Sequence, residues 1–176
     1  MRNVMNTSQP LARTLGDRRG FTLVEVLVAA MILVVALLTL ASMFPVGYKQ
    51  IADGGRMTMA VTGARQILED IGDVPFNNIS NLNGVDTASN TGVIAGLTGT
   101  EAAIARRWRY MLAGSGNGFS FTATETAAWG TPQTYAARAV VTVANTSATL
   151  RTVTVTVTIP GLPNAVTMGT VIVRFF

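Results

Sequence analysis

Arg18-Arg19-Gly20-Phe21-Thr22-Leu23-Val24-Glu25 runs directly into an uncharged and largely apolar segment, residues 26–48. As an α-helix this segment would rise about 35 Å, enough to cross the ~30 Å hydrocarbon core of a membrane. An unpaired carboxylate inside that core costs roughly 2–4 kcal/mol. The stretch therefore predicts a membrane helix whose first turn carries a paired acidic residue, Glu25.

The flanks of the apolar segment fix its expected orientation and argue against other export signals. Arg18 and Arg19 predict that the preceding residues stay in the cytoplasm and that the chain beyond Lys49 lies outside. A secretory signal would have an apolar core of about 7–15 residues and a small-x-small cleavage site, which residues 41–43 match poorly. A plain membrane anchor explains the length and the arginines, but it does not explain Gly20-Phe21 or Glu25.

Composition limits the classes of function. The 176 residues allow one modest domain beside the membrane segment. The net charge of +4 is mostly local: Arg2, Arg13, Arg18 and Arg19 against Asp17 give +3 in residues 1–20, and the remaining nine basic and eight acidic residues give +1. The high isoelectric point of the chain therefore reflects mainly residues 1–20, and it does not favour nucleic-acid binding.

The chain contains no cysteine and no histidine. This removes disulfides, thiolate metal sites, the commonest general base and the commonest zinc ligand. We therefore expect no enzymatic activity, no cofactor and no metal site.

The run Gly-Phe-Thr-Leu-Val-Glu-Val-Leu-Val-Ala, residues 20–29, resembles the processing motif of type IV prepilins and type II secretion pseudopilins. The resemblance implies that a prepilin peptidase cleaves between Gly20 and Phe21 and methylates the new Phe21 amine. It also implies that Glu25 pairs with the amine of a neighbouring subunit and that Pro45, like Glu25, serves assembly. The implied partners are this peptidase, other pilin or pseudopilin subunits, an inner-membrane assembly platform and membrane lipid.

The same resemblance implies an α+β, pilin-like architecture in four parts. Residues 1–20 would be a cytoplasmic leader, 21–48 a transmembrane and assembly helix, 49–72 an amphipathic helix, and 73–176 an αβ-loop and antiparallel sheet. The expected function is a structural subunit, minor rather than major, that is stored in the bacterial inner membrane as a single-pass protein and then moves into a filament. The alternative is a membrane-tethered module that binds a ligand or DNA, as in a competence pseudopilin.

Two further segments, residues 64–71 and 150–157, resemble I-type minor pseudopilins and V-type minor pilins. Pili, secretion pseudopili and competence pseudopili share all of these parts, so the sequence does not name the machine.

One long helix is predicted over residues 21–71. Pro45 removes a hydrogen bond from its interior, and Gly54 and Gly55 weaken later turns. We expect the helix to bend or open between Ser42 and Gly55, and an alternative is that it ends near Pro45. Its second half has an apolar face at spacings of three and four residues: Met57, Ala60, Val61, Ala64, Ile67, Leu68 and Ile71.

Beyond the helix, residues 73–102 are rich in Asn, Gly, Thr and Ser and predict a long connection, with a short helix near Thr100–Ala105. Residues 150–159 alternate valine or isoleucine with threonine, which predicts a strand with one buried face. The other expected strands are residues 107–112, 136–144 and 166–176. Residues 119–124 fit either a strand or a loop.

Arg106, Arg107 and Arg109 surround Trp108 in the one basic cluster that includes aromatic residues. Such a cluster can contact phosphates and stack bases. Strand alternation with Trp108 and Tyr110 inward and Arg107 and Arg109 outward explains it equally well, so nucleic-acid contact is the less favoured interpretation.

Overall fold

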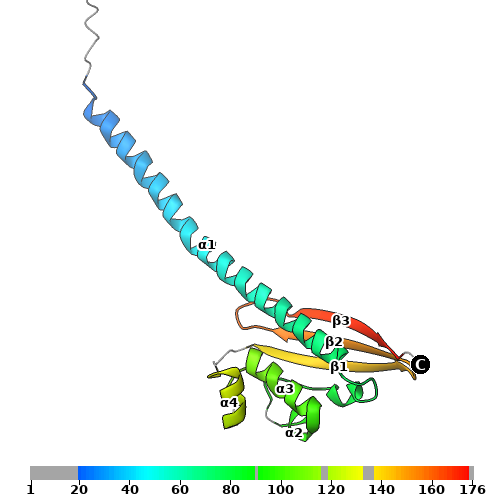
Figure 1. Cartoon of the computed structure of the whole chain (residues 1–176). Helices are drawn as coiled ribbons and strands as arrows, with labels where there is room; N and C mark the ends of the chain where they lie inside the picture. The colour runs from blue at the N-terminus through cyan, green and yellow to red at the C-terminus, as the bar shows by residue number, and fades with distance from the viewer. Residues whose placement is uncertain (1–19, 90, 116–118, 133–136, 175–176) are drawn as a thin grey trace, which may run out of the picture. The chain divides into compact units, whose positions relative to one another are not determined.

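The structure is a computed structural model that describes residues 20–89, 91–115, 119–132 and 137–174 (Figure 1). The chain separates into two compact units, residues 1–46 and 47–176. Helix α1 (Leu23–Gly72) contributes to both units. The other elements belong to the second unit: η1 (Ile79–Leu82), α2 (Val93–Gly96), α3 (Gly99–Leu112), α4 (Ala123–Trp129), β1 (Arg138–Ser147), β2 (Leu150–Thr158) and β3 (Val166–Val173).

The part of α1 that belongs to the first unit, from Leu23 to Val46, exposes its large apolar side chains throughout. The helix is long and apolar enough to cross a membrane, and none of its most apolar window is buried inside the protein. The expected apolar N-terminal helix is therefore present, and the described residues provide no apolar environment for its side chains.

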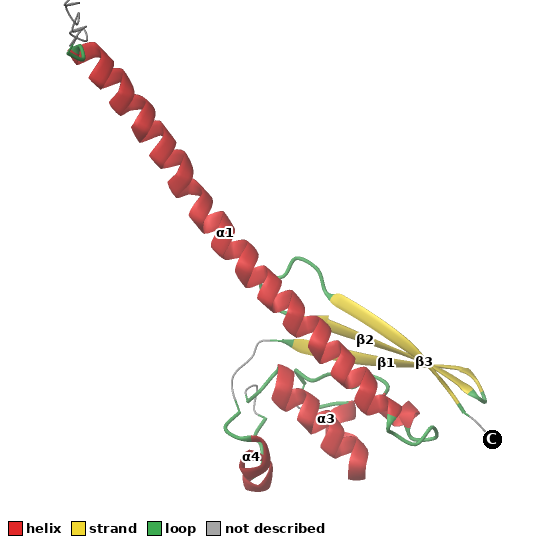
Figure 2. Ribbon diagram, turned by 45° about the horizontal axis from the view of Figure 1, so that its top comes forward, coloured by secondary structure: helices red, strands yellow, loops and turns green. Residues whose placement is uncertain are grey.

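Helix α1 is continuous through Pro45 and through Gly54 and Gly55 (Figure 2). The expected opening between Ser42 and Gly55 is wrong for this structure, as is the alternative that the helix ends near Pro45. The physical reason is that one proline removes a single intrahelical hydrogen bond. The remaining bonds of a 50-residue helix are sufficient to continue it on both sides. The expected bend stays a prediction.

The sheet of the second unit is antiparallel and has the order β1-β2-β3. This confirms the α+β class and the expected antiparallel sheet. In β2 the alternation is as expected, because Val153, Val155 and Val157 are buried while the threonines between them are partly exposed. The strand predicted over 136–144 starts at Arg138 and extends to Ser147. Residues 136, 175 and 176 lie outside the described residues.

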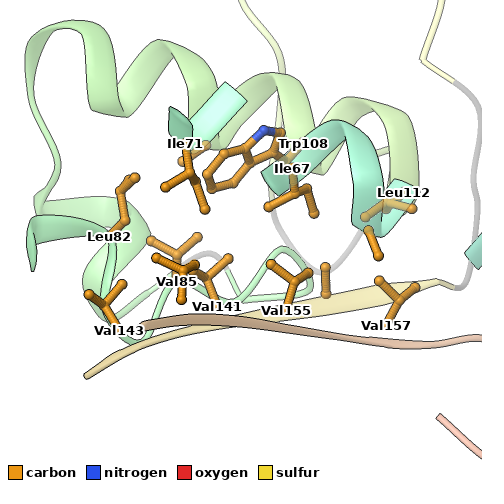
Figure 3. Close-up of a cluster of buried hydrophobic side chains, with 14 of the residues drawn as sticks. Ile67, Ile71, Leu82, Val85, Trp108, Leu112, Val141, Val143, Val155 and Val157 are labelled. Carbon is orange, nitrogen blue, oxygen red and sulfur yellow. The ribbon is translucent and has the colours of Figure 1, made fainter. Parts of the chain in front are cut away.

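The core lies between one face of the sheet and helices α1 and α3 (Figure 3). From α1, the side chains of Ala60, Ala64, Ile67 and Ile71 are fully buried, as their spacing predicts. Met57, which was expected on the same face, is 49% exposed. The second half of α1 thus supplies the apolar partner that the valine face of β2 requires.

The strand predicted over residues 107–112 is wrong, because these residues form the second half of α3. The buried side chains of this helix include Ala105, Trp108 and Leu112, which recur every three or four residues. The short alternation of arginine and aromatic residues resembled a strand only over a few positions. The helix expected near Thr100–Ala105 is the first half of the same α3.

The connection between α1 and α3 contains η1, α2 and a segment that pairs with the outer edge of β1. Backbone hydrogen bonds join Gly84 and Val85 to Val141, each at 2.9 Å, and Asp86 bridges Val140. The Arg138 guanidinium also pairs with the Asp86 carboxylate at 2.7 Å. Residues 119–124 form no strand of the sheet, and α4 begins at Ala123.

Candidate functional site

The candidate site is the start of α1, residues 20–26. Thr22 precedes the first helical residue, and its Oγ1 accepts a hydrogen bond from the backbone N–H of Glu25 at 3.2 Å. The Thr22 carbonyl accepts from the N–H of Val26 at 3.1 Å. Thr22 therefore caps the helix and satisfies one of its unpaired N–H groups. The Thr-x-x-Glu pattern was the available sequence signal for this cap, and the sequence analysis missed it.

Gly20 is exposed, and a Cβ added there would have no heavy atom within 4 Å. The described chain therefore imposes no steric need for glycine at this position. Phe21, which follows it, is 82% exposed. A requirement for Gly20 would have to come from another molecule that approaches the Gly20–Phe21 peptide.

Glu25 lies in the first turn of α1 with an exposed side chain. Among the described residues, its carboxylate has no hydrogen-bond or ion-pair partner. The positive helix N-terminus favours this charge by only about 0.3–1 kcal/mol, which is less than the cost of burying it in hydrocarbon. A partner outside the described chain is therefore needed wherever this turn is surrounded by apolar groups.

Pro45 lies inside α1, one residue before the end of the first unit, and it is exposed. Among the described residues, no interaction of its side chain assigns it a function. Its proposed importance for assembly stays a prediction.

The arginines of the basic cluster point in different directions because they lie on a helix. Arg106 pairs with Glu125 of α4, with Nη2 and Oε2 2.7 Å apart. Hydrogen bonding from Arg106 lowers the pKa of Glu125 to about 2. Arg107 is exposed. The three arginines therefore do not form one basic surface.

Arg109 is only 1% exposed, so its expected outward orientation is wrong. Its Nη1 donates to the carbonyl of Ser89 at 2.6 Å, and its guanidinium carbon lies 4.0 Å from the centroid of the Phe119 ring. Burial lowers the pKa of Arg109. These contacts join the loop around Ser89 to α3 and give Arg109 a structural role.

The aromatic residues near this cluster also pack on each other. Tyr110 of α3 lies against Phe121 and Trp129, with ring centroids 5.6 and 5.5 Å apart, and its hydroxyl donates to the carbonyl of Trp129. Helix α4 is thereby attached to α3 through the aromatic contacts and the Arg106–Glu125 ion pair. Within the described ranges, no group of three His, Cys, Asp or Glu side chains is placed to bind a metal.

Comparison with known proteins points to the same N-terminal segment. Residues 16–41 match the family model described as the prokaryotic N-terminal methylation motif. The match includes Gly20, Phe21 and Glu25, and it ends before Pro45. No curated protein and no solved structure matches the chain. The chain therefore carries the N-terminal methylation motif that is the hallmark of type IV pilins and pseudopilins.

Proposed function

We propose that this chain is a structural subunit, minor rather than major, of a type IV pilus or a type II secretion-like pseudopilus. It is cleaved after Gly20 and assembles through its N-terminal helix. The observation that carries the proposal is Glu25, a carboxylate without a partner among the described residues, in the first turn of an exposed apolar helix and inside a matched methylation motif. The motif is that of structural subunits rather than enzymes.

Processing requires access to one peptide bond. Hydrolysis between Gly20 and Phe21 by a prepilin peptidase would leave a new amino group on Phe21, and N-methylation of that group keeps its positive charge. The open surroundings of Gly20 and the exposure of Phe21 support this step, since neither residue is covered by the described chain.

Assembly would then use one positive and one negative charge from each subunit. The Phe21 ammonium of one subunit pairs with the Glu25 carboxylate of its neighbour, while the apolar side chains of α1 pack between helices. Two unit charges 4 Å apart attract by about 1 kcal/mol in water and by about 4 kcal/mol at an effective dielectric constant of 20. The pair thus stabilises the correct stagger of neighbouring helices and removes the cost of an unpaired carboxylate.

Before assembly, α1 would anchor the chain in the bacterial inner membrane as a single span. Arg18 and Arg19 favour a cytoplasmic leader, so residues 47–176 would lie on the opposite side. The subunit would meet the peptidase and the assembly platform at this membrane.

The test of processing is the mature N-terminus of protein purified from the native host. Intact mass and terminal sequencing should give a chain that begins at Phe21 and carries an N-methyl group. Full-length protein in cells with active prepilin peptidase, or a different N-terminus, would refute the proposal and favour the tethered ligand- or DNA-binding module.

The test of assembly compares Glu25→Val with Glu69→Val, a matched loss of charge at an exposed position of the same helix. Glu25→Val should leave membrane insertion and cleavage intact and reduce the amount of subunit in sheared filaments. Glu69→Val should assemble as the wild type does. Equal incorporation of both variants would contradict the charge-pair mechanism.

A further inference from the structure

A cavity of about 350 Å³ lies at the N-terminal end of α3, where this helix meets η1 and α2. This volume is at the lower end of the range found for ligand pockets. Six residues line it: Asn81, Val93, Gly96, Leu97, Thr98 and Glu101. All of them belong to the second unit, and none takes part in the N-terminal site described above.

The most informative residue in this cavity is Glu101, which is only 9% exposed. Its carboxylate folds back over the first turn of α3, since Oε2 lies 3.8 Å from the position of a Cβ built on Gly99. Within the part of the chain that the structure describes, this carboxylate has no hydrogen-bond or ion-pair partner. Neither of its oxygens is among the buried polar atoms without a hydrogen-bond partner, so the carboxylate reaches the open cavity, where a partner can bind it.

Thr98 and Glu101 have the spacing of a capping box, in which each side chain would bond the backbone N–H of the other residue. Thr98 is the N-cap of α3, but its side chain makes no capping hydrogen bond. In α4 the same pattern is fully formed by Thr122 and Glu125. The hydroxyl of Thr98 and the carboxylate of Glu101 thus remain available to a molecule in the cavity.

The lining has the chemistry of a site for one organic cation. Glu101 supplies one negative charge, Thr98 and Asn81 supply neutral oxygens, and Val93 and Leu97 supply an apolar wall. An ammonium group has three hydrogen-bond donors and no acceptor, and an alkyl stem packs well on apolar side chains. A calcium ion would require six to eight oxygen ligands, typically with several carboxylates, and the cavity offers a single carboxylate.

We propose that this cavity binds an alkylammonium group, with Glu101 as its counter-ion. The group belongs either to a small molecule or to a lysine side chain of a neighbouring subunit. Only the second source rests on the proposed assembly into a filament. Binding of an alkylammonium group to Glu101 does not depend on that assembly.

The first experiment uses the full chain in detergent micelles and n-butylammonium, the analogue of a lysine side chain, as the probe. Calorimetric titration should show saturable binding that neutral n-butanol does not compete away. Glu101→Gln keeps the side-chain shape and should weaken binding about tenfold or more, as expected for a charged hydrogen bond. Glu69→Gln is the matched control and should bind as the wild type does. Thermal melting checks that both variants are folded.

Three results would overturn the proposal. They are absence of saturable n-butylammonium binding to the folded wild type, equal binding to the wild type and Glu101→Gln, and tighter binding of calcium chloride at the same cavity. None of these results depends on cleavage at Gly20 or on filament formation, so they are distinguishable from a failure of the proposed function.

The second experiment identifies the source of the cation by repeating the titration on assembled filaments. Binding to both detergent-solubilised chain and filaments supports a small molecule. Binding to the solubilised chain alone supports occupation by a neighbour. In that case a carbodiimide should link Glu101 to a lysine, and Lys49 is the single lysine of this chain, so the cross-linked peptides distinguish a second copy from another subunit.

Discussion

Asp70, near the end of α1, connects this helix to α3 through the core. Its Oδ2 accepts a hydrogen bond from Nε1 of Trp108 at 2.7 Å, and its Oδ1 accepts from Nε2 of Gln66 at 2.9 Å. Trp108 is fully buried between α1, α3 and the sheet (Figure 3). Asp70→Ala would leave the buried indole N–H of Trp108 without a hydrogen-bond acceptor.

The expected cost follows from that lost acceptor. A buried donor left unsatisfied costs about 1–3 kcal/mol, against a total stability of about 5–15 kcal/mol for a domain. For a unit the size of residues 47–176, each kcal/mol shifts Tm by about 3–5 °C. Asp70→Ala should therefore lower the Tm of this unit by about 3–15 °C.

The assay is differential scanning calorimetry of the full chain in detergent, with Glu69→Ala as the control at the adjacent exposed position. A double-mutant cycle with Trp108→Phe, which removes the indole N–H, isolates the hydrogen bond. Asp70→Ala should lower the free energy of unfolding by a smaller amount in the Trp108→Phe background than in the wild type. The difference should be about 1 kcal/mol or more. The same cost in both backgrounds would show that Asp70 does not act through Trp108.

Three other predictions concern separate features. Gly20→Val should block cleavage by obstructing the peptidase while leaving the Tm of the second unit unchanged, because no atom of the described chain contacts this position; immunoblots for the unprocessed chain check this. Gly54→Ala should stabilise α1 by up to about 1 kcal/mol, since a Cβ there meets nothing within 4 Å, and a lower Tm would contradict this. Arg106 holds the pKa of Glu125 at about 2, so the ion pair stabilises the fold fully above the ordinary value of 4.5 and is lost as the pH falls toward 2. Glu125→Gln should therefore lower Tm at neutral pH and flatten its fall in acid, as measured by calorimetry across this range.

Local periodicity predicted the elements whose pattern extends over many residues. The alternation of β2 assigns Val153, Val155 and Val157 to the buried face because one residue in two contacts the helices. The apolar length after Glu25 likewise predicts α1 without any tertiary information. For these elements, the sequence pattern and the packed structure depend on the same repeating geometry.

Elements that depend on distant contacts were predicted poorly. Residues 107–110 alternate like a strand, and only the longer pattern of Ala105, Trp108 and Leu112 indicates a helix. The pairing of residues 84–87 with β1 uses backbone groups, which have no side-chain signature. Arg109 was expected to point outward because strand alternation placed it opposite Trp108 and Tyr110. Its burial depends on Ser89 and Phe119, which the fold brings beside it.

The clearest limit of local reasoning is the Thr-x-x-Glu pattern, which occurs at residues 22–25, 98–101 and 122–125. In α4 both capping bonds form, and the carboxylate also pairs with Arg106. At the start of α1 only the threonine bond is made, and in α3 the threonine side chain makes none. The same four-residue signal therefore gives one satisfied carboxylate and two without a partner in the described chain. Because an unpartnered carboxylate is costly once it is surrounded by apolar groups, the two incomplete motifs are the positions where we propose that another molecule binds: a neighbour's amino terminus at Glu25 and an alkylammonium group at Glu101.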